Sequence, residues 1–156
     1  MSSSSCGSSS VSEAWLPVGF CASVFARDVR EARGMVVDVR DGGLLVVERG
    51  ESRILALYDL DGDGYAEERR IVASAPGLNH GIALGNGFLY ASRDTEVYRW
   101  RYDAGSSGED RTTVVSGIPE GGHQTRTLLL DGNFLFVSVG SMDNVDKDSS
   151  RSRVKL

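Results

Sequence analysis

His80-Gly81-Ile82-Ala83-Leu84, followed by Phe88-Leu89-Tyr90-Ala91-Ser92, is the middle copy of a strand–turn–strand pattern that occurs three times in this chain. The other two copies are Arg33-Gly34-Met35-Val36-Val37 with Leu44-Leu45-Val46-Val47, and Arg126-Thr127-Leu128-Leu129-Leu130 with Phe134-Leu135-Phe136-Val137-Ser138. Gly34 and Gly81 are 47 positions apart, and Gly81 and Thr127 are 46 apart. A period of about 40–50 residues with several short strands per copy is typical of β-propeller blades. We therefore expect an all-β chain.

Alternating apolar residues and turn signals divide each copy into short strands. In the first copy the expected strands are Gly34–Asp38, Leu44–Glu48, Arg53–Asp59 and Arg69–Ser74. In the second they are Gly81–Leu84, Phe88–Ser92, Glu96–Tyr102 and Thr112–Ser116. In the third they are Thr125–Leu130 and Phe134–Val139, and Arg151–Leu156 could begin another. Residues 16–156 thus predict about two and a half blades.

An additional strand is expected before the first copy, over Gly19–Ala26. An N-terminal strand of this kind often completes the last blade of a propeller, and a ring closes with about four to eight blades. We therefore expect the N-terminal part of a longer protein. Cys21 is expected to be a small buried residue of this strand, with a disulfide to Cys6 as the alternative.

Residues 1–15 are expected to form a disordered, serine-rich leader. The first ten residues contain neither a basic region nor an apolar run, so they do not resemble a secretory signal. With only two cysteines, the composition leaves the cellular compartment open.

Charge and composition exclude several classes of function. The formal net charge of −5 and the lack of a basic, aromatic-rich cluster argue against a nucleic-acid partner. No apolar run approaches the ~20 residues that span a membrane. The chain also lacks a phosphate-binding glycine loop before a helix, a Gly-x-Ser-x-Gly motif and a convincing zinc-ligand spacing.

An acidic stretch, Asp59-Leu60-Asp61-Gly62-Asp63-Gly64, follows the third strand of the first copy. Asp59, Asp61 and Asp63 alternate before a glycine, as in the first half of an EF-hand calcium loop. The twelfth position is Arg70 instead of a bidentate glutamate, and the flanks are expected strands. The stretch is therefore either an acidic hairpin turn or a weak calcium site.

Both histidines precede a first strand, and the first strands of a propeller surround its central channel. His80 follows Asn79, and His123 lies three residues before Arg126. Arg33 takes the same place in the first copy, so these polar residues are expected to share one mouth of the channel. A neutral histidine there could remove a proton from an alcohol, or it could simply bind loop carbonyls.

Several segments, in order, resemble the glucose/sorbosone dehydrogenase family, which includes pyranose dehydrogenases that use pyrroloquinoline quinone (PQQ). The segments that carry the resemblance include Leu44–Gly50, Gly77–Ala83, Leu89–Ser92, Val97–Trp100, His123–Leu128, Val137–Ser141 and Asn144–Asp146. The resemblance extends from about Leu16 to Asp148. It implies a six-bladed propeller with PQQ and calcium on one face, which oxidises the C1 hydroxyl of a sugar, or a related aldehyde or alcohol. An external electron acceptor is then also implied.

The resemblance also implies roles for particular residues. His123 matches the catalytic base that takes the hydroxyl proton, and Asn79, His80 and Arg126 match positions near PQQ. Ser141 lies where soluble glucose dehydrogenases have a carboxylate that orients the histidine, with Asp143 two positions later.

Two other functions remain open at this point. One is a non-catalytic propeller of the same lineage that binds a partner or glycan through its rim. The other is a calcium-dependent lactonase-like hydrolase, which is disfavoured because the expected channel mouth offers arginine and histidine instead of carboxylates.

Overall fold

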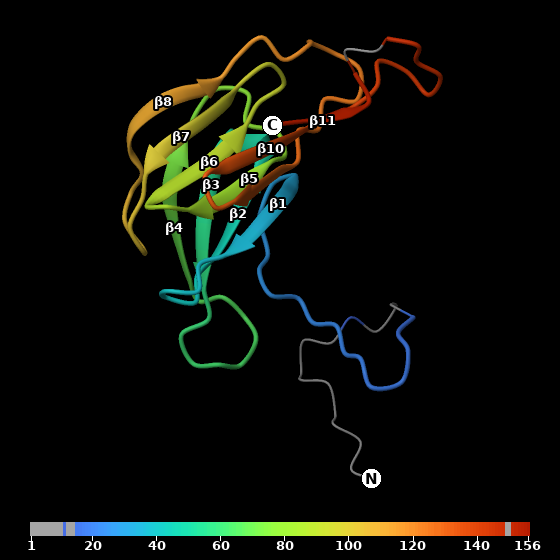
Figure 1. Cartoon of the computed structure of the whole chain (residues 1–156). Helices are drawn as coiled ribbons and strands as arrows, with labels where there is room; N and C mark the ends of the chain where they lie inside the picture. The colour runs from blue at the N-terminus through green and yellow to red at the C-terminus, as the bar shows by residue number, and fades with distance from the viewer. Residues whose placement is uncertain (1–10, 12–14, 149–150) are drawn as a thin grey trace.

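Three antiparallel β-sheets make up the protein (Figure 1). The computed structural model describes residues 11, 15–148 and 151–156. Sheet 1 contains β1 (Ala32–Val37), β2 (Leu44–Glu48), β3 (Arg53–Tyr58) and β4 (Glu68–Ser74), and the 3-10 helix η1 (Arg49–Glu51) joins β2 to β3. Sheet 2 contains β5 (Ile82–Gly85), β6 (Phe88–Ser92), β7 (Val97–Arg101) and β8 (Glu109–Val115). Sheet 3 contains β9 (Leu128–Asp131), β10 (Phe134–Val139) and β11 (Arg153–Lys155).

Each sheet is an up-and-down meander in which consecutive strands pair. This arrangement confirms the expected all-β class and the repeated blade unit. The second strands β2, β6 and β10 have the predicted bounds, because a run of apolar residues between two turns determines both of their ends. No helix in the described ranges is long and apolar enough to cross a membrane.

The first strands of sheets 2 and 3 begin later than predicted, for one shared reason. The Gly81 N–H donates to Ser92 Oγ at 2.8 Å, and the Thr127 N–H donates to Ser138 Oγ at 2.9 Å. A serine hydroxyl thus accepts the hydrogen bond at this place, so regular pairing begins one residue further on. Ser92 and Ser138 are 46 positions apart and are a repeat feature that the sequence pattern did not indicate.

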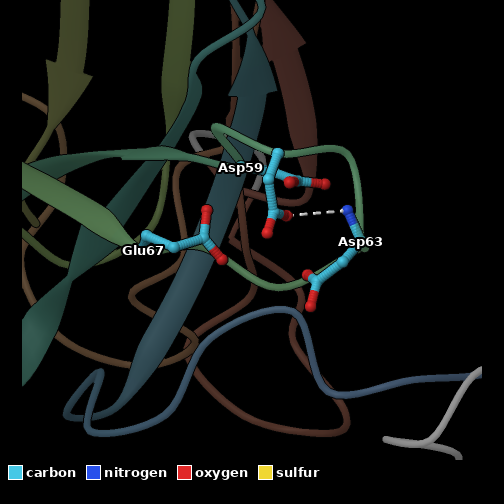
Figure 2. Close-up of side chains that lie close together, drawn as sticks. Asp59, Asp63 and Glu67 are labelled. Atoms are coloured by element: carbon cyan, nitrogen blue, oxygen red, sulfur yellow. Dashed lines mark hydrogen bonds between the residues drawn. The ribbon is translucent and has the colours of Figure 1, made fainter.

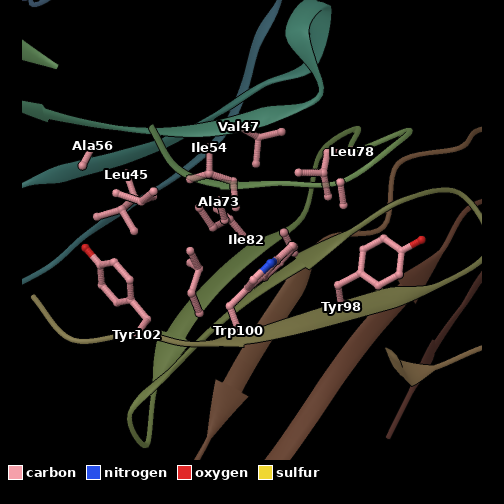
Figure 3. Close-up of a cluster of buried hydrophobic side chains, with 14 of the residues drawn as sticks. Leu45, Val47, Ile54, Ala56, Ala73, Leu78, Ile82, Tyr98, Trp100 and Tyr102 are labelled. Atoms are coloured by element: carbon pink, nitrogen blue, oxygen red, sulfur yellow. The ribbon is translucent and has the colours of Figure 1, made fainter. Parts of the chain in front are cut away.

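The main core lies between sheets 1 and 2 (Figure 3). Leu45 and Ile54 face Trp100 and Tyr98 across the sheets, and all four side chains are buried. A second core joins sheets 2 and 3, where Val97 packs with the other members of that cluster, Ala83, Tyr90, Ile118, Leu128, Val137 and Val139. Strand β7 therefore contributes to both cores, because its alternate side chains point to opposite faces.

Two glycines let neighbouring sheets approach closely. A Cβ atom on Gly34 would collide with the carbonyl oxygen of His80, and one on Gly81 would collide with that of Arg126. The Gly34 N–H donates to the same His80 oxygen at 3.2 Å. Thr127 takes this place in the third copy. The glycines at the start of the first two copies are thus needed for packing between blades.

The predicted leading strand over Gly19–Ala26 is wrong. Only Ser23 forms a bridge in this stretch. Phe25 packs instead on the outer face of sheet 1, and its carbonyl accepts the Ala66 N–H at 2.7 Å. Cys21 is exposed instead of buried, and it is not a free thiol. The alternative partner Cys6 and most of the predicted leader lie outside the described residues.

Candidate active site

The predicted rim residues lie in the loops that lead into β5 and β9, except for Arg33, which lies near the start of β1. The Asn79 N–H donates to the Ser92 carbonyl at 3.1 Å, and Asn79 Nδ2 donates to the Gln124 carbonyl at 2.9 Å. Gln124 follows His123 directly in the chain. Asn79 therefore joins the rim of sheet 2 to the loop that carries the predicted base.

A hollow of about 200 Å³ opens at this rim, which we call the rim cavity. Its lining residues are Arg33 on β1, Arg49 in η1, Asn79 in the loop before β5, and Gly122, Gln124 and Thr125 in the loop before β9. A second hollow of about 290 Å³ shares Arg49, Asn79 and Gln124 with it. Arg33 and Asn79 are thus brought together as expected. Arg49 was not predicted, although it follows a second strand just as Arg93 does one repeat later.

His123 is exposed, and its orientation is set by the loop at Ser141. The His123 N–H donates to the Ser141 carbonyl at 2.8 Å, and His123 Nδ1 lies 3.3 Å from Ser141 Oγ. A Cβ atom on Gly140 would collide with the His123 carbonyl, and one on Gly122 would lie 2.5 Å from the Ser141 carbonyl. The two loops can pack this closely only with glycine at both positions. When the proton is on Nδ1, Ser141 Oγ accepts a hydrogen bond from it. Nε2 is then unprotonated and free to act as a base.

Ser141, and not Asp143, is therefore the residue beside the predicted base. Asp143 Oδ1 accepts the Asn144 N–H at 2.8 Å, within its own turn. Asp146 stabilises the same loop, because its carboxylate accepts the N–H groups of Met142 at 2.6 Å and Asp148 at 2.8 Å. These two backbone hydrogen bonds lower the pKa of Asp146.

Arg126 lies beneath the rim instead of facing the cavity. Its side chain is fully buried, and all five of its N–H donors are used. They donate to the carbonyls of Asp94, His123, Thr125 and Pro119 and to the carboxylate of Asp94, at 2.6–3.1 Å. Burial lowers the pKa of Arg126, and the nearby Asp94 charge opposes that shift. Direct contact with a cofactor would require breaking one of these bonds, so the geometry gives Arg126 a positioning role.

Two charged residues that the sequence reasoning missed complete this support. Asp94 Oδ2 accepts the Gly121 N–H at 2.9 Å, while Asp94 Oδ1 binds Arg126 at 2.6 Å. Arg151 is almost fully buried and donates to the carbonyls of Gly121 at 3.1 Å and Glu120 at 2.6 Å. Together they hold both sides of the loop that precedes His123. Neither follows the repeat, so the pattern offered no signal for them.

His80 is half-buried and lies at the junction of sheets 1 and 2. Its Nδ1 atom is buried and has no hydrogen-bond partner among the residues that the structure describes. A buried, unpaired ring nitrogen is unfavourable, since its desolvation is not compensated. His80 therefore offers a polar atom to a group that this part of the chain does not supply.

The predicted calcium-loop residues do come together. Asp59, Asp61, Asp63 and Glu67 each place a carboxylate oxygen so that all four atoms lie within 4.8 Å of one another. Figure 2 shows Asp59, Asp63 and Glu67 in this loop. Glu67 was not predicted as a ligand, but it holds the ninth position of the loop, which often contributes a ligand through water. Its carboxylate also accepts the Leu60 N–H at 2.8 Å.

The acidic loop lies away from the histidines. It follows the end of β3, whereas the rim cavity includes Arg49 just after β2, and these strands are antiparallel. The loop and the rim are therefore at opposite ends of sheet 1. Its carboxylates also accept backbone N–H groups within the loop, as an acidic turn would. A cation bound here would stabilise the loop without touching the rim.

Comparisons with known proteins agree with this architecture. The TrAA12-like family matches residues 15–155. A PQQ-dependent sugar dehydrogenase from Hypocrea jecorina (strain QM6a) is 38% identical over 125 residues. That match covers 73% of this chain and 29% of the relative.

Solved structures give the same result. The holo PQQ domain of a pyranose dehydrogenase from Coprinopsis cinerea is 29% identical with a TM-score of 0.70, over 80% of this chain and 32% of that one. An iodide and a calcium structure of a Trichoderma reesei carbohydrate-active enzyme of family AA12 are both 31% identical, with TM-scores of 0.72 and 0.70. The match to the iodide structure covers 82% of this chain and 36% of the enzyme chain, and the match to the calcium structure covers 80% and 33%.

The chain thus spans about a third of the length of these relatives. It is related to PQQ-dependent sugar dehydrogenases, and its three sheets are consistent with part of a propeller. Because the family match includes nearly all of the described residues, the chain belongs to the TrAA12-like family.

Proposed function

We propose that this chain forms part of a PQQ-dependent sugar dehydrogenase in which His123 is the general base for oxidation of the sugar C1 hydroxyl. The observation that carries the proposal is the geometry of His123. Its side chain is exposed at the rim, and its Nδ1 atom is 3.3 Å from Ser141 Oγ, which leaves Nε2 available. The related dehydrogenases named above support the reaction class, a PQQ-dependent sugar oxidation.

The residues of this chain perform the proton transfer of the proposed reaction. His123 Nε2 accepts the C1 hydroxyl proton, and the bond of Nδ1 to Ser141 holds the ring in place as charge develops. PQQ, when bound, supplies the acceptor for the hydride that leaves C1. Arg126, Asp94 and Arg151 act indirectly, because their hydrogen bonds hold the loops around His123.

Part of the cofactor face also fits this proposal. Asn79 lines the rim cavity, and the buried Nδ1 atom of His80 lacks a partner among the described residues. These two residues remain our candidates for contact with PQQ, whereas the donors of Arg126 are all used within the chain. Calcium at the PQQ face would need other ligands, since the acidic loop lies at the opposite end of sheet 1.

We further propose that the three sheets are blades of a six-bladed ring. The face of sheet 3 that points away from sheet 2 exposes Leu129, Phe134 and Val154. Such an apolar face fits the packing of a further blade. An external electron acceptor would complete the catalytic cycle.

One observation favours the non-catalytic binding module instead. A neutral hydroxyl, Ser141, stands beside His123 where soluble glucose dehydrogenases have a carboxylate. A hydroxyl stabilises an imidazolium less than a carboxylate does. The two functions differ in whether substrate is oxidised at all.

The test uses the full-length protein that contains this chain, loaded with PQQ and calcium. We expect sugar-dependent reduction of a dye, and we expect His123→Ala to lower kcat by a factor of about 10² or more. Arg101→Ala, at an exposed position on β7, is the control and should retain activity. Unchanged turnover in His123→Ala would contradict the assignment of the base. Absence of dye reduction in the wild-type protein would favour the binding module.

A further inference from the structure

The rim cavity is positively charged and polar. Two of its six lining residues are arginines, Arg33 and Arg49, and none of the six is acidic. We propose that these arginines bind the carboxylate of an acidic sugar, such as a hexuronate, and that they determine the substrate class. This inference rests on the proposed function, because it names the class of substrate that the same site would oxidise.

Arg33 is available for a ligand, in contrast to its counterpart in the third copy. Arg33 and Arg126 occupy the same place in the repeat. Arg126 is buried and donates all five of its side-chain N–H groups to the protein, whereas the Arg33 side chain is exposed and has no hydrogen bond or ion pair with the described part of the chain. A guanidinium group presents two parallel N–H donors that match a carboxylate.

Arg49 is held only weakly by the protein. Its ion pair with Glu31 is 3.5 Å long, and both side chains are about half exposed, at 44% and 58%. Exposed pairs of this kind contribute little free energy, so a ligand carboxylate can compete with Glu31 for Arg49. The cavity therefore contains two cationic groups and no strong internal counter-charge.

The remaining lining residues suit sugar hydroxyl groups. Asn79, Gln124 and Thr125 offer amide and hydroxyl groups that donate and accept hydrogen bonds. None of the six lining residues is aromatic or aliphatic beyond glycine and threonine. PQQ also carries carboxylates, but its planar aromatic rings would need apolar or aromatic surface that these six residues do not offer. The lining therefore suits a polyhydroxylated acid, and Asn79 is the one lining residue that we also propose to contact PQQ.

The position of the cavity also fits the proposed chemistry. Gly122 and Gln124, which line it, are the two chain neighbours of His123. In a hexuronate the carboxylate at C6 and the reacting C1 lie on opposite sides of the ring oxygen. Binding of the C6 carboxylate by the arginines would anchor one end of the sugar while the C1 end extends toward His123.

Direct binding to the 156-residue chain tests this inference without requiring oxidation. Glucuronate, glucose and PQQ are titrated separately and followed by NMR, at low and high salt. We expect glucuronate to bind at least about 10-fold more tightly than glucose, and we expect salt to weaken that preference. We expect Arg33→Ala and Arg49→Ala each to weaken glucuronate binding about 10-fold or more, with little effect on glucose.

Two variants control for charge and folding. Arg101→Ala removes an exposed charge on β7 and should leave binding unchanged. Arg33→Lys keeps the positive charge but loses the two parallel N–H donors of the guanidinium group, so it should bind glucuronate more tightly than Arg33→Ala but less tightly than the wild type. Equal binding of glucuronate and glucose, no binding of either, or competition by PQQ for the arginines would overturn the inference. If glucuronate binds as expected but the full-length protein does not oxidise sugars, only the proposed function fails.

Discussion

Arg126 Nη2 lies 2.6 Å from Asp94 Oδ1, and this ion pair between a buried arginine and a half-buried aspartate joins the rim of sheet 2 to the loop that carries His123. The Arg126 Nη1 atom also donates to the His123 carbonyl at 2.8 Å. The position of the predicted base therefore depends on a residue that does not itself reach the rim. Such a residue can transmit a change in packing to the loop that carries His123.

Arg126→Ala should destabilise the protein by about 3–5 kcal/mol, because it leaves the Asp94 carboxylate and several carbonyls without their donor. Urea unfolding measures the loss. Arg101→Ala removes an exposed arginine whose partner Asp110 is 3.6 Å away, so it should cost less than about 1 kcal/mol. Similar costs for both variants would mean that the buried network contributes little.

Ser141→Ala removes the contact that orients the imidazole of His123, which is 3.3 Å from the hydroxyl. We expect kcat of the full-length enzyme to fall about 10-fold with little change in KM, since the base remains but is less well aligned. Steady-state kinetics check this. Ser141→Thr keeps the hydroxyl and should restore most of the rate. A larger effect on KM than on kcat would indicate a binding role for Ser141.

Gly81→Ala should destabilise the packing of sheet 2 on sheet 3. The added methyl group would collide with the Arg126 carbonyl, a backbone atom that cannot move without shifting the β9 rim. Overpacking of this kind costs about 1–3 kcal/mol or more, and thermal unfolding should show a lower Tm. Thr127→Ala is the matched change at the exposed third repeat position and should cost within about 0.5 kcal/mol.

Calcium should bind the acidic loop and raise the Tm. The four carboxylates of Asp59, Asp61, Asp63 and Glu67 repel one another, and a bound cation removes that repulsion. Isothermal titration with calcium measures the affinity, and Asp61→Asn should weaken it. Asp131→Asn, an exposed change on β9, is the control. If calcium releases no heat and leaves the Tm unchanged, the loop is an acidic turn only.

Acid should weaken the fold through Asp38. Three hydrogen bonds from Arg40, at 2.7–3.0 Å, lower the pKa of this buried carboxyl below its ordinary value of 3.8. The stabilisation is present above pH 3.8 and is lost as the pH falls through the lower folded-state pKa. Asp38→Asn should therefore be less stable at pH 7 and lose less stability between pH 5 and pH 2. Unfolding measured across that range would contradict this if both proteins lost the same amount.

Much of the fold could be predicted from local pattern. The bounds of β2, β6 and β10 were correct, because an apolar run between two turns determines a strand almost independently of its neighbours. Alternation of apolar and polar residues correctly indicated that β7 is a strand. The acidic loop was also visible, since its carboxylates are close in sequence, although Glu67 was not predicted to join them.

The rest of the fold and of the site could not be predicted, because it depends on which surfaces pack against one another. The stretch Gly19–Ala26 alternates like a strand, yet only Ser23 forms a bridge, and only Phe25 and Ala26 at its end pack on sheet 1. Asp94 and Arg151 follow no repeat, so only the tertiary structure shows that they hold the His123 loop.

The sequence by itself determined the repeat, its strands and the place of the polar residues at the start of each copy. Only the tertiary structure decided what those residues do. Arg33 and Arg126 are equivalent in the repeat, but one is exposed beside a cavity and the other is buried among carbonyls. The physical reason is that a side chain's environment is set by the sheet packed against it, and the repeat in the sequence carries no information about which copy has such a neighbour.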